Sequence, residues 1–204
     1  MSTSNHQKNT KLSKTTTQPI RDKKQVNALI NHYLYQGQIR NYTLITMGIY
    51  TALRISDLLR LTWGDVYDFS NKRIRSVISL TESKTGKNKV IALHKNCVTA
   101  LKHCLHTDRP TSRNHPLFEN KKSGKPISRV QAYRIIRTAS EAVDLDIPAS
   151  CHSLRKTFGY HAWKDGISPA VIMEIYNHSS LAVTRRYLGV TQDDKNEVYL
   201  GLVI

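Results

Sequence analysis

Apolar residues recur at intervals of three and four along most of this chain, the spacing that places side chains on one face of an α-helix. The first such stretch starts at Gln25 and ends at Gly37, since glycine commonly follows the last turn of a helix. A second stretch, residues 40–55, predicts a core helix because its small and apolar residues share one face. These residues are Ile45, Gly48, Ile49 and Ala52.

The apolar spacing breaks after this core helix, at Leu53 and Arg54. Beyond the break, residues 57–63 predict a short helix that Ser56 and Asp57 can cap through their side-chain oxygens. Arg54 therefore stands at a break in an apolar region, where an unpaired guanidinium would be costly. A functional reason for this charge is expected.

Residues 73–95 change to an alternation of apolar and polar positions, which is typical of a half-buried strand. A turn rich in Gly, Asn and Lys divides this stretch, and a second β-rich run follows. We predict a β-hairpin whose tip is Lys84–Lys89. The apolar members of the first strand are Ile74, Ile78 and Leu80.

The remainder of the chain predicts helices again. One runs from His94 to His106, and a second begins after a Ser128 cap. In the second helix five residues are expected to face inward, and they are Val130, Tyr133, Ile136, Ala139 and Val143. Three more helices are predicted within residues 151–166, 167–177 and 179–189. The predicted fold class is mainly α with a small antiparallel β-sheet (α+β).

The amino-acid composition indicates what kind of molecule the protein binds. The 204 residues include 31 Lys and Arg against 15 Asp and Glu, a formal net charge of +16, so a polyanion such as nucleic acid is the expected partner. Residues 1–24 are polar and basic and are predicted to form a flexible arm. The predicted organisation is this arm, a globular domain over residues 25–190, and a C-terminal helix or tail over residues 191–204.

Other compartments and chemistries find less support in the sequence. No window approaches the ~18 apolar residues of a membrane span, and the first residues lack the apolar centre of a secretion signal, so a cytoplasmic location is predicted. The cysteines are expected to be reduced, half-buried thiols; they are Cys97, Cys104 and Cys151. The only adjacent acids, Asp193 and Asp194, have no partner motif, so neither a metal nor another cofactor is predicted.

A basic protein without a metal site can still act on a phosphodiester through a nucleophilic side chain. Such a site needs arginines, because the planar guanidinium matches two phosphate oxygens at once. The segment "HSLR" supplies His152 and Arg155 on one helix face, and "NHSSLAVTRRY" supplies His178 and Tyr187. A lysine on the hairpin, Lys84, could deliver a proton to a leaving oxygen.

Four segments together resemble the motifs of the tyrosine recombinase (phage integrase) family: "TALRISDLLRL", "SKTGKNKVIAL", "HSLRKTFGYHAW" and "NHSSLAVTRRY". They occur in family order, and the resemblance covers about residues 25–190. It implies a metal-independent enzyme that breaks and rejoins double-stranded DNA. Integration, excision or inversion of a mobile or invertible DNA element are the implied outcomes.

The resemblance also implies a role for each matching residue. Arg54 and Arg155 would clamp the phosphate, and Lys84 would protonate the 5′ oxygen. His152 would accept the phenol proton. The remaining roles fall to His178, which would bond the phosphate, Tyr187, which would attack it, and Asp57, which would support the site from behind. Two positions depart from the family pattern, since Ala52 and Asn177 stand where glycine is usual.

The family further implies a tetramer on DNA, with the terminal tail docking into a neighbouring protomer and accessory DNA-bending proteins as possible partners. The arm of residues 1–24 is too short to be the separate N-terminal DNA-binding domain usual in the family. The resemblance is therefore to recombinases made of the catalytic domain alone, and a fragment of a longer integrase is the other interpretation. Two alternative functions remain. One is relaxation of DNA in the manner of a type IB topoisomerase, and the other is a helix-turn-helix regulator built on residues 168–188.

Overall fold

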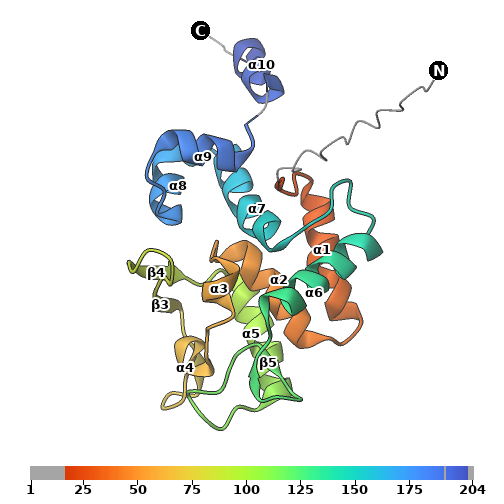
Figure 1. Ribbon diagram of the computed structural model, residues 1–204, viewed down its shortest axis with the longest axis vertical. Helices are drawn as coiled ribbons and strands as arrows, with labels where there is room; N and C mark the ends of the chain where they lie inside the picture. Colours follow the sequence, from red (N-terminus) through yellow and green to blue (C-terminus); the bar gives the residue numbers. More distant parts are fainter. Residues whose placement is uncertain (1–16, 191, 202–204) are drawn as a thin grey trace, which may run out of the picture.

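The computed structural model describes residues 17–190 and 192–201, and this part of the chain is mainly helical with three two-stranded antiparallel sheets (Figure 1). The predicted fold class is therefore confirmed. Helix α2 (Ile39–Tyr50) packs against α1 (Lys23–Tyr35) and against two later helices, α5 (Lys95–Asp108) and α7 (Cys151–Lys164). All nine residues from Asn41 to Ile49 are buried, which confirms the predicted core helix.

The N-terminal boundary lies earlier than the sequence predicted. Ile20, assigned to the flexible arm, is 1% exposed and packs in the same apolar cluster as α1 and α2. Its backbone N–H donates to the Thr157 hydroxyl at 2.9 Å. A single apolar side chain in a polar segment gives little signal by itself, so this attachment was missed. Residues 1–16 of the predicted arm lie outside the described residues.

The break after α2 is present, but the helix beyond it was misplaced. Helix α3 (Ile55–Leu58) begins directly after Arg54, and a separate α4 (Trp63–Val66) carries its own capping box between Thr62 and Asp65. The prediction of one helix over 57–63 is therefore wrong. Asp57 does not cap a helix; its carboxylate accepts hydrogen bonds from Ser83 in the hairpin.

The hairpin consists of β3 (Val77–Thr81) and β4 (Asn88–Ala92), with Ile78 opposite Ile91. Its turn covers residues 82–87, so Lys89 lies within the second strand rather than at the tip. Ile74 belongs to a different pair, in which β2 (Arg73–Ile74) bonds with β1 (Tyr67–Asp68). A third short pair joins β5 (Glu119–Asn120) to β6 (Lys125–Pro126).

Helices α5 (Lys95–Asp108) and α6 (Arg129–Ala142) follow the predicted boundaries closely, and Ser128 caps α6 as expected. The inward face of α6 was predicted incorrectly at two positions. Val130 is 57% exposed and Tyr133 is 46% exposed, whereas Ile136 and Ala139 are fully buried. The buried face instead includes Ala132, because α6 packs on α1, α2, α3 and α7 through its small residues.

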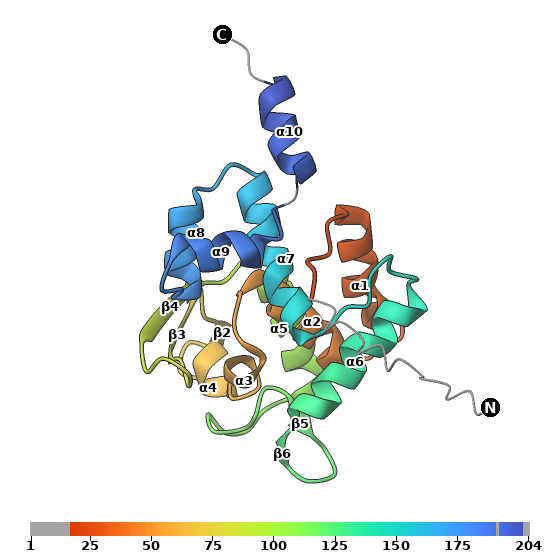
Figure 2. The same cartoon turned by 45° about the horizontal axis from the view of Figure 1, so that its top comes forward.

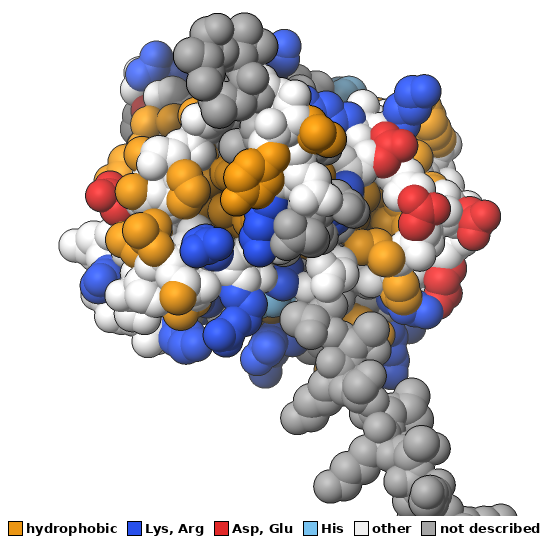
Figure 3. Space-filling model, turned by 90° about the horizontal axis from the view of Figure 1, so that it is seen from above, with side chains coloured by type: hydrophobic (Ala, Val, Ile, Leu, Met, Phe, Trp, Pro, Cys, Tyr) orange, Lys and Arg blue, Asp and Glu red, His pale blue; other side chains and the backbone are white. Residues whose placement is uncertain are grey.

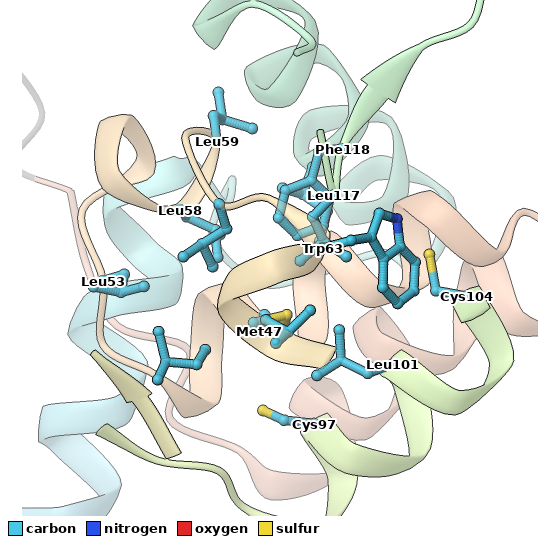
Figure 4. Close-up of a cluster of buried hydrophobic side chains, with 14 of the residues drawn as sticks. Met47, Leu53, Leu58, Leu59, Trp63, Cys97, Leu101, Cys104, Leu117 and Phe118 are labelled. Atoms are coloured by element: carbon cyan, nitrogen blue, oxygen red, sulfur yellow. The ribbon is translucent and has the colours of Figure 1, made fainter. Parts of the chain in front are cut away.

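Buried side chains between Leu44 and Ala132 form a large apolar core (Figure 4). Trp63 lies at its centre between residues of α2, α3 and α5 and the segment around Leu117. Cys97 and Cys104 are fully buried in this core as free thiols, deeper than the predicted half-burial. Burial also raises the pKa of Cys97 to about 12, so both thiols serve packing.

The second half contains α7 (Cys151–Lys164), α8 (Pro169–Tyr176), α9 (Leu181–Leu188) and α10 (Gln192–Gly201). Helices α7, α8 and α9 pack on one another around a small apolar cluster. Helix α10 stands away from the rest of the molecule in both ribbon views (Figures 1 and 2), with Lys164 and Asp194 paired at 2.9 Å near its start. None of the helices in the described part combines the length and apolar character that crossing a bilayer requires.

Candidate active site

Two arginines from distant parts of the chain meet at the end of α8. The Arg155 guanidinium donates to the Tyr176 carbonyl at 3.0 Å and also to the Ala52 carbonyl. The Arg54 guanidinium donates to the same Tyr176 oxygen at 3.5 Å. Arg155 is 2% exposed and lies over the Tyr176 ring, 4.5 Å from its centroid. Stacking and two carbonyls therefore hold the planar fork in one orientation.

The break between α2 and α3 aims both arginines. Ala52 has a φ of +53°, a left-handed conformation that costs about 1–2 kcal/mol for a residue with a side chain. This turn points the Ala52 carbonyl at the Arg155 guanidinium. It also places Arg54, two residues later, at the start of α3 beside the site. The usual glycine of the resembling family is explained by the same angle. Alanine is the smallest side chain that can occupy it.

Three aromatic rings lie around the predicted nucleophile. The Tyr187 ring in α9 lies 4.9 Å from the rings of Tyr176 and His178 and 5.0 Å from that of His152, measured between centroids. His178 is fixed by a 3.0 Å hydrogen bond between its Nδ1 and the Thr184 hydroxyl. The Tyr187 hydroxyl is buried and makes no hydrogen bond of ordinary geometry among the described residues, although the Arg155 guanidinium lies close enough to lower its pKa. It is therefore a polar group in need of a ligand.

Both site histidines are held in the neutral state. Burial and the positive charges of Arg155 and Arg54 lower the pKa of His178 to about 4. Partial burial, together with Lys156 and Arg155, lowers the pKa of His152 as well. A neutral imidazole can accept a proton, so His152 suits the role of base toward the neighbouring phenol at pH 7.

The phenol itself is not activated in the protein alone. Burial raises the pKa of Tyr187, and the charges of Arg155 and Arg54 oppose that effect without overcoming it. Another cation lies close by, since the Lys156 ammonium is 5.3 Å from the centroid of the Tyr187 ring. Lys156 adjoins Arg155 and is buried, and it was not among the predicted site residues. A lysine one residue from a motif arginine on a largely buried helix was the available signal.

The predicted general acid, Lys84, forms no hydrogen bond or ion pair with the other predicted site residues in the described part of the chain. Lys84 is exposed in the hairpin turn, and it reaches the others only through its charge, which contributes to the lowered pKa of His152. The turn is anchored beside it, since the Asp57 carboxylate accepts from the Ser83 backbone at 2.9 Å and from the Ser83 hydroxyl. Asp57 thus supports the hairpin.

Two further residues of the hairpin reach the site without having been predicted. Glu82 is 1% exposed and pairs with Arg54 at 2.8 Å. The Lys89 ammonium donates to the Ile175 carbonyl at 2.7 Å, and burial followed by the charge of Arg155 lowers the pKa of Lys89 to about 8. Their positions in the hairpin carried no sequence signal of burial, because both belong to a polar turn and its flank.

The site can therefore hold an anion between guanidinium groups, beside a phenol and two neutral imidazoles. Within residues 17–190 and 192–201, no group of three or more His, Cys, Asp and Glu side chains gathers as metal ligands do. Lys and Arg side chains also gather on the face that Figure 3 shows, while its acidic side chains lie mainly along one side. Such a surface suits a long polyanion.

Several known proteins are similar to this chain in sequence. The family model described as the phage integrase family matches residues 20–194. The probable integrase/recombinase YoeC of Bacillus subtilis is 38% identical over 183 residues, covering 89% of this chain and 94% of YoeC. The tyrosine recombinase XerD of Corynebacterium glutamicum is 29% identical and is matched over 80% of this chain, which spans 52% of XerD.

Solved structures agree on the fold. The XerA recombinase superposes with a TM-score of 0.74 at 23% identity, over 91% of this chain and 66% of XerA. XerH, solved with its difH substrate before cleavage, superposes with a TM-score of 0.68 at 20% identity, over 94% of this chain and 56% of XerH. The chain belongs to the phage integrase family, and residues 20–194 form its tyrosine recombinase catalytic domain.

Proposed function

We propose that the protein is a site-specific DNA recombinase that cleaves and rejoins strands through a covalent link to Tyr187. The observation that carries the proposal is the burial of the unpartnered Tyr187 hydroxyl beside two neutral histidines and two guanidinium groups. DNA as the substrate is supported by the net charge of +16 and by relatives solved on DNA.

In the proposed cleavage step, the scissile phosphate occupies the space between Arg54 and Arg155. The Tyr187 oxygen attacks phosphorus and forms a phosphotyrosyl bond to the 3′ end, while the bond from phosphorus to the 5′ oxygen breaks. The phenol proton passes to His152, and the leaving 5′ oxygen takes a proton from Lys84. His178 donates a hydrogen bond to a phosphate oxygen. Attack by another 5′ hydroxyl reverses these transfers and seals a new strand.

The arginines are needed for a quantitative reason. With a reference pKa near 10, ionising a tyrosine at pH 7 costs ~4 kcal/mol. Burial of Tyr187 adds to this cost in the free protein. Transfer of the proton to His152 during attack avoids a free phenolate, and the guanidinium groups stabilise the charge that develops on the phosphoryl oxygens.

A nicked suicide duplex tests the proposal. Cleavage next to the nick releases a short piece and traps the covalent adduct, so wild-type protein in EDTA should give a protein–DNA band that Tyr187→Phe does not give. Retarded complexes without an adduct in either protein would contradict the proposal and favour a helix-turn-helix regulator. Adding a second duplex separates strand exchange from relaxation of the topoisomerase type.

We also propose that α10 docks into a neighbouring protomer within a tetramer on DNA. Its Tyr199 and Leu200 are 81% and 88% exposed on a helix that stands apart from the body, so two apolar side chains lack a cover (Figure 2). Residues 202–204 of the tail lie outside the described part. Deleting residues 192–204 should reduce strand exchange more than cleavage of a single site, and equal loss of both would refute docking in trans.

A further inference from the structure

A buried carboxylate connects three separate segments of the active site. The Glu82 Oε2 atom lies 2.8 Å from the Arg54 guanidinium, 2.9 Å from the Asn177 amide nitrogen and 2.8 Å from the Thr85 hydroxyl. Its Oε1 atom lies 3.9 Å from the Lys89 ammonium. Glu82 is 1% exposed, so these groups, rather than water, satisfy the charge.

Each group that bonds to Glu82 Oε2 either takes part in the proposed reaction or directly adjoins a residue that does. Arg54 is itself one of the two proposed phosphate ligands. Thr85 directly follows Lys84, and its bond ties the turn that carries the general acid to the floor of the site. Asn177 directly precedes His178. A single carboxylate thus holds the Arg54 side chain and the backbone beside Lys84 and His178, the three groups that must surround one phosphate.

The Asn177 contact accounts for a departure from the family pattern. Asn177 has a φ of +52°, a left-handed conformation that glycine and asparagine accept most readily. Glycine would satisfy the backbone but could not reach Glu82. Asparagine satisfies the backbone and also donates its amide to the carboxylate, across 95 residues of sequence.

Placing a negative charge beside a phosphate site has a cost, because the charge repels the substrate. The surroundings reduce that cost, since Arg54 and Lys89 both face the carboxylate and Arg155 lies close to Arg54. Burial alone would raise the pKa of Glu82, yet hydrogen bonds from Arg54, Asn177 and Thr85 lower it to about 2. The group is therefore ionised whenever the enzyme works, and its benefit must be sought in geometry.

We propose that Glu82 is a positioning residue for DNA cleavage. Its carboxylate holds the turn that carries Lys84 and the turn that carries His178 at fixed positions relative to Arg54. This inference rests on the proposed function. It predicts two separable effects, because Lys84 acts on the leaving 5′ oxygen whereas His178 acts on the phosphate. Loss of the Thr85 bond should harm the first and loss of the Asn177 bond the second.

The test uses two suicide duplexes that differ in one atom. In the second, sulfur replaces the bridging 5′ oxygen, and a thiolate leaves without needing a proton. Thr85→Val should slow single-turnover cleavage of the oxygen duplex about 10-fold, the effect of one hydrogen bond to a charged group. It should cleave the sulfur duplex at nearly the wild-type rate. Asn177→Gly should slow both duplexes by a similar factor.

Matched variants make the outcome decisive. Thr81→Val removes a hydroxyl that donates to the Asn88 side chain at 2.9 Å in the same hairpin. This bond does not involve the Glu82 carboxylate, so the variant should cleave both duplexes at the wild-type rate. In a Glu82→Gln background, Thr85→Val and Asn177→Gly should each add little further loss, since their common partner is already altered. If Glu82→Gln does not fold, the two single-bond variants still decide the question.

Two results would overturn the positioning role. Equal defects of Thr85→Val on the oxygen and sulfur duplexes would indicate general loosening of the fold, and wild-type rates in both Thr85→Val and Asn177→Gly would show that the bonds do nothing for cleavage. Failure of the proposed function would look different, because wild-type protein would then give no adduct dependent on Tyr187 with either duplex.

Discussion

The two sides of the active site rest on cores of very different size. The arginine side, which comprises α2, α3, the β3–β4 hairpin and α7, is continuous with the two large apolar clusters of the molecule. The tyrosine side, which comprises α8 and α9, is held by a small cluster with only four fully buried members; they are Ala52, Ile172, Tyr176 and Leu188. Val171, Leu181 and Val183 on the tyrosine side remain exposed.

Polar contacts compensate for the thin apolar contact between the two sides. The Tyr176 carbonyl accepts from both arginines, and the Tyr176 hydroxyl donates to the Arg155 carbonyl at 2.6 Å. Glu82 and Lys89 of the hairpin add bonds to Asn177 and Ile175. The groups proposed to bind phosphate therefore also tie α8 to the body, and α8 packs on α9, the helix that carries Tyr187. We therefore expect phosphate binding to affect the placement of Tyr187.

The largest expected effect comes from removing the arginine that serves both purposes. Arg155→Ala should lower single-turnover cleavage by about 10³-fold, because a fixed donor to the developing charge is lost. It also removes the bonds to Ala52 and Tyr176, so the tyrosine side should lose amide-exchange protection. Arg137→Ala, which removes an exposed arginine paired with Glu141, is the control. Unchanged cleavage in Arg155→Ala would contradict the phosphate clamp.

A second prediction compares two glycines of the arginine side, one that faces the tyrosine side and one that does not. A side chain at Gly159 in α7 would clash with the Tyr176 hydroxyl, which is itself bonded to Arg155. A side chain at Gly48 in α2 would approach most closely the tip of Leu154, at 2.7 Å. Gly159→Ala should therefore cost about 3 kcal/mol and Gly48→Ala distinctly less, because a leucine tip can rotate away. Denaturant unfolding measures both. A larger loss in Gly48→Ala would reverse our ranking of the two interfaces.

A third prediction concerns the acid stability of the contact between hairpin and α8. Glu82 has a folded pKa of about 2 against 4.5 for the free side chain, so its stabilisation is complete above pH 4.5 and is lost as pH falls toward 2. Wild-type protein should lose on the order of 3 kcal/mol more than Glu82→Gln across that window. Glu141→Gln, at an exposed pair, should match wild type. Parallel curves for wild type and Glu82→Gln would refute the pairing.

The pH dependence of cleavage provides a fourth prediction. The pKa of His152 lies below its ordinary value of 6.5, so the neutral proton acceptor persists to more acidic pH than in a free histidine. At subsaturating DNA, where the rate reports the free enzyme, adduct formation should fall only below pH 6.5. An acid limb at or above pH 6.5 would exclude His152 as the base in the arrangement described.

The smallest expected effect is at the turn that joins the two sides. Ala52→Gly should relieve about 1–2 kcal/mol of left-handed strain, but it removes a buried methyl group and adds backbone freedom. The opposing terms leave the unfolding free energy within about 1 kcal/mol of wild type. Cleavage should be unchanged, since the carbonyl that holds Arg155 stays in place. A loss above 2 kcal/mol would show that the methyl group matters more than the strain.

The sequence by itself determined the long helices, the β3–β4 hairpin and the charge, because these depend on local periodicity, caps and composition. It did not determine the two short helices α3 and α4. Motif resemblance also named Arg54, His152, Arg155, His178 and Tyr187, which the fold brings to one place. Periodicity shows which face of a helix is apolar, but not how much of it a neighbour covers, and Val130 and Tyr133 were misassigned for that reason.

Only the tertiary structure decided which polar groups are buried together. Asp57 bonds across 26 residues to Ser83, and Glu82 across 95 residues to Asn177. The attachment of Ile20 to Thr157 spans 137 residues. A buried carboxylate and a solvated one look alike in a sequence, because the difference lies in partners that the chain supplies from elsewhere. The motifs therefore identify the residues of the site, whereas contacts between segments that are distant in the sequence determine its geometry.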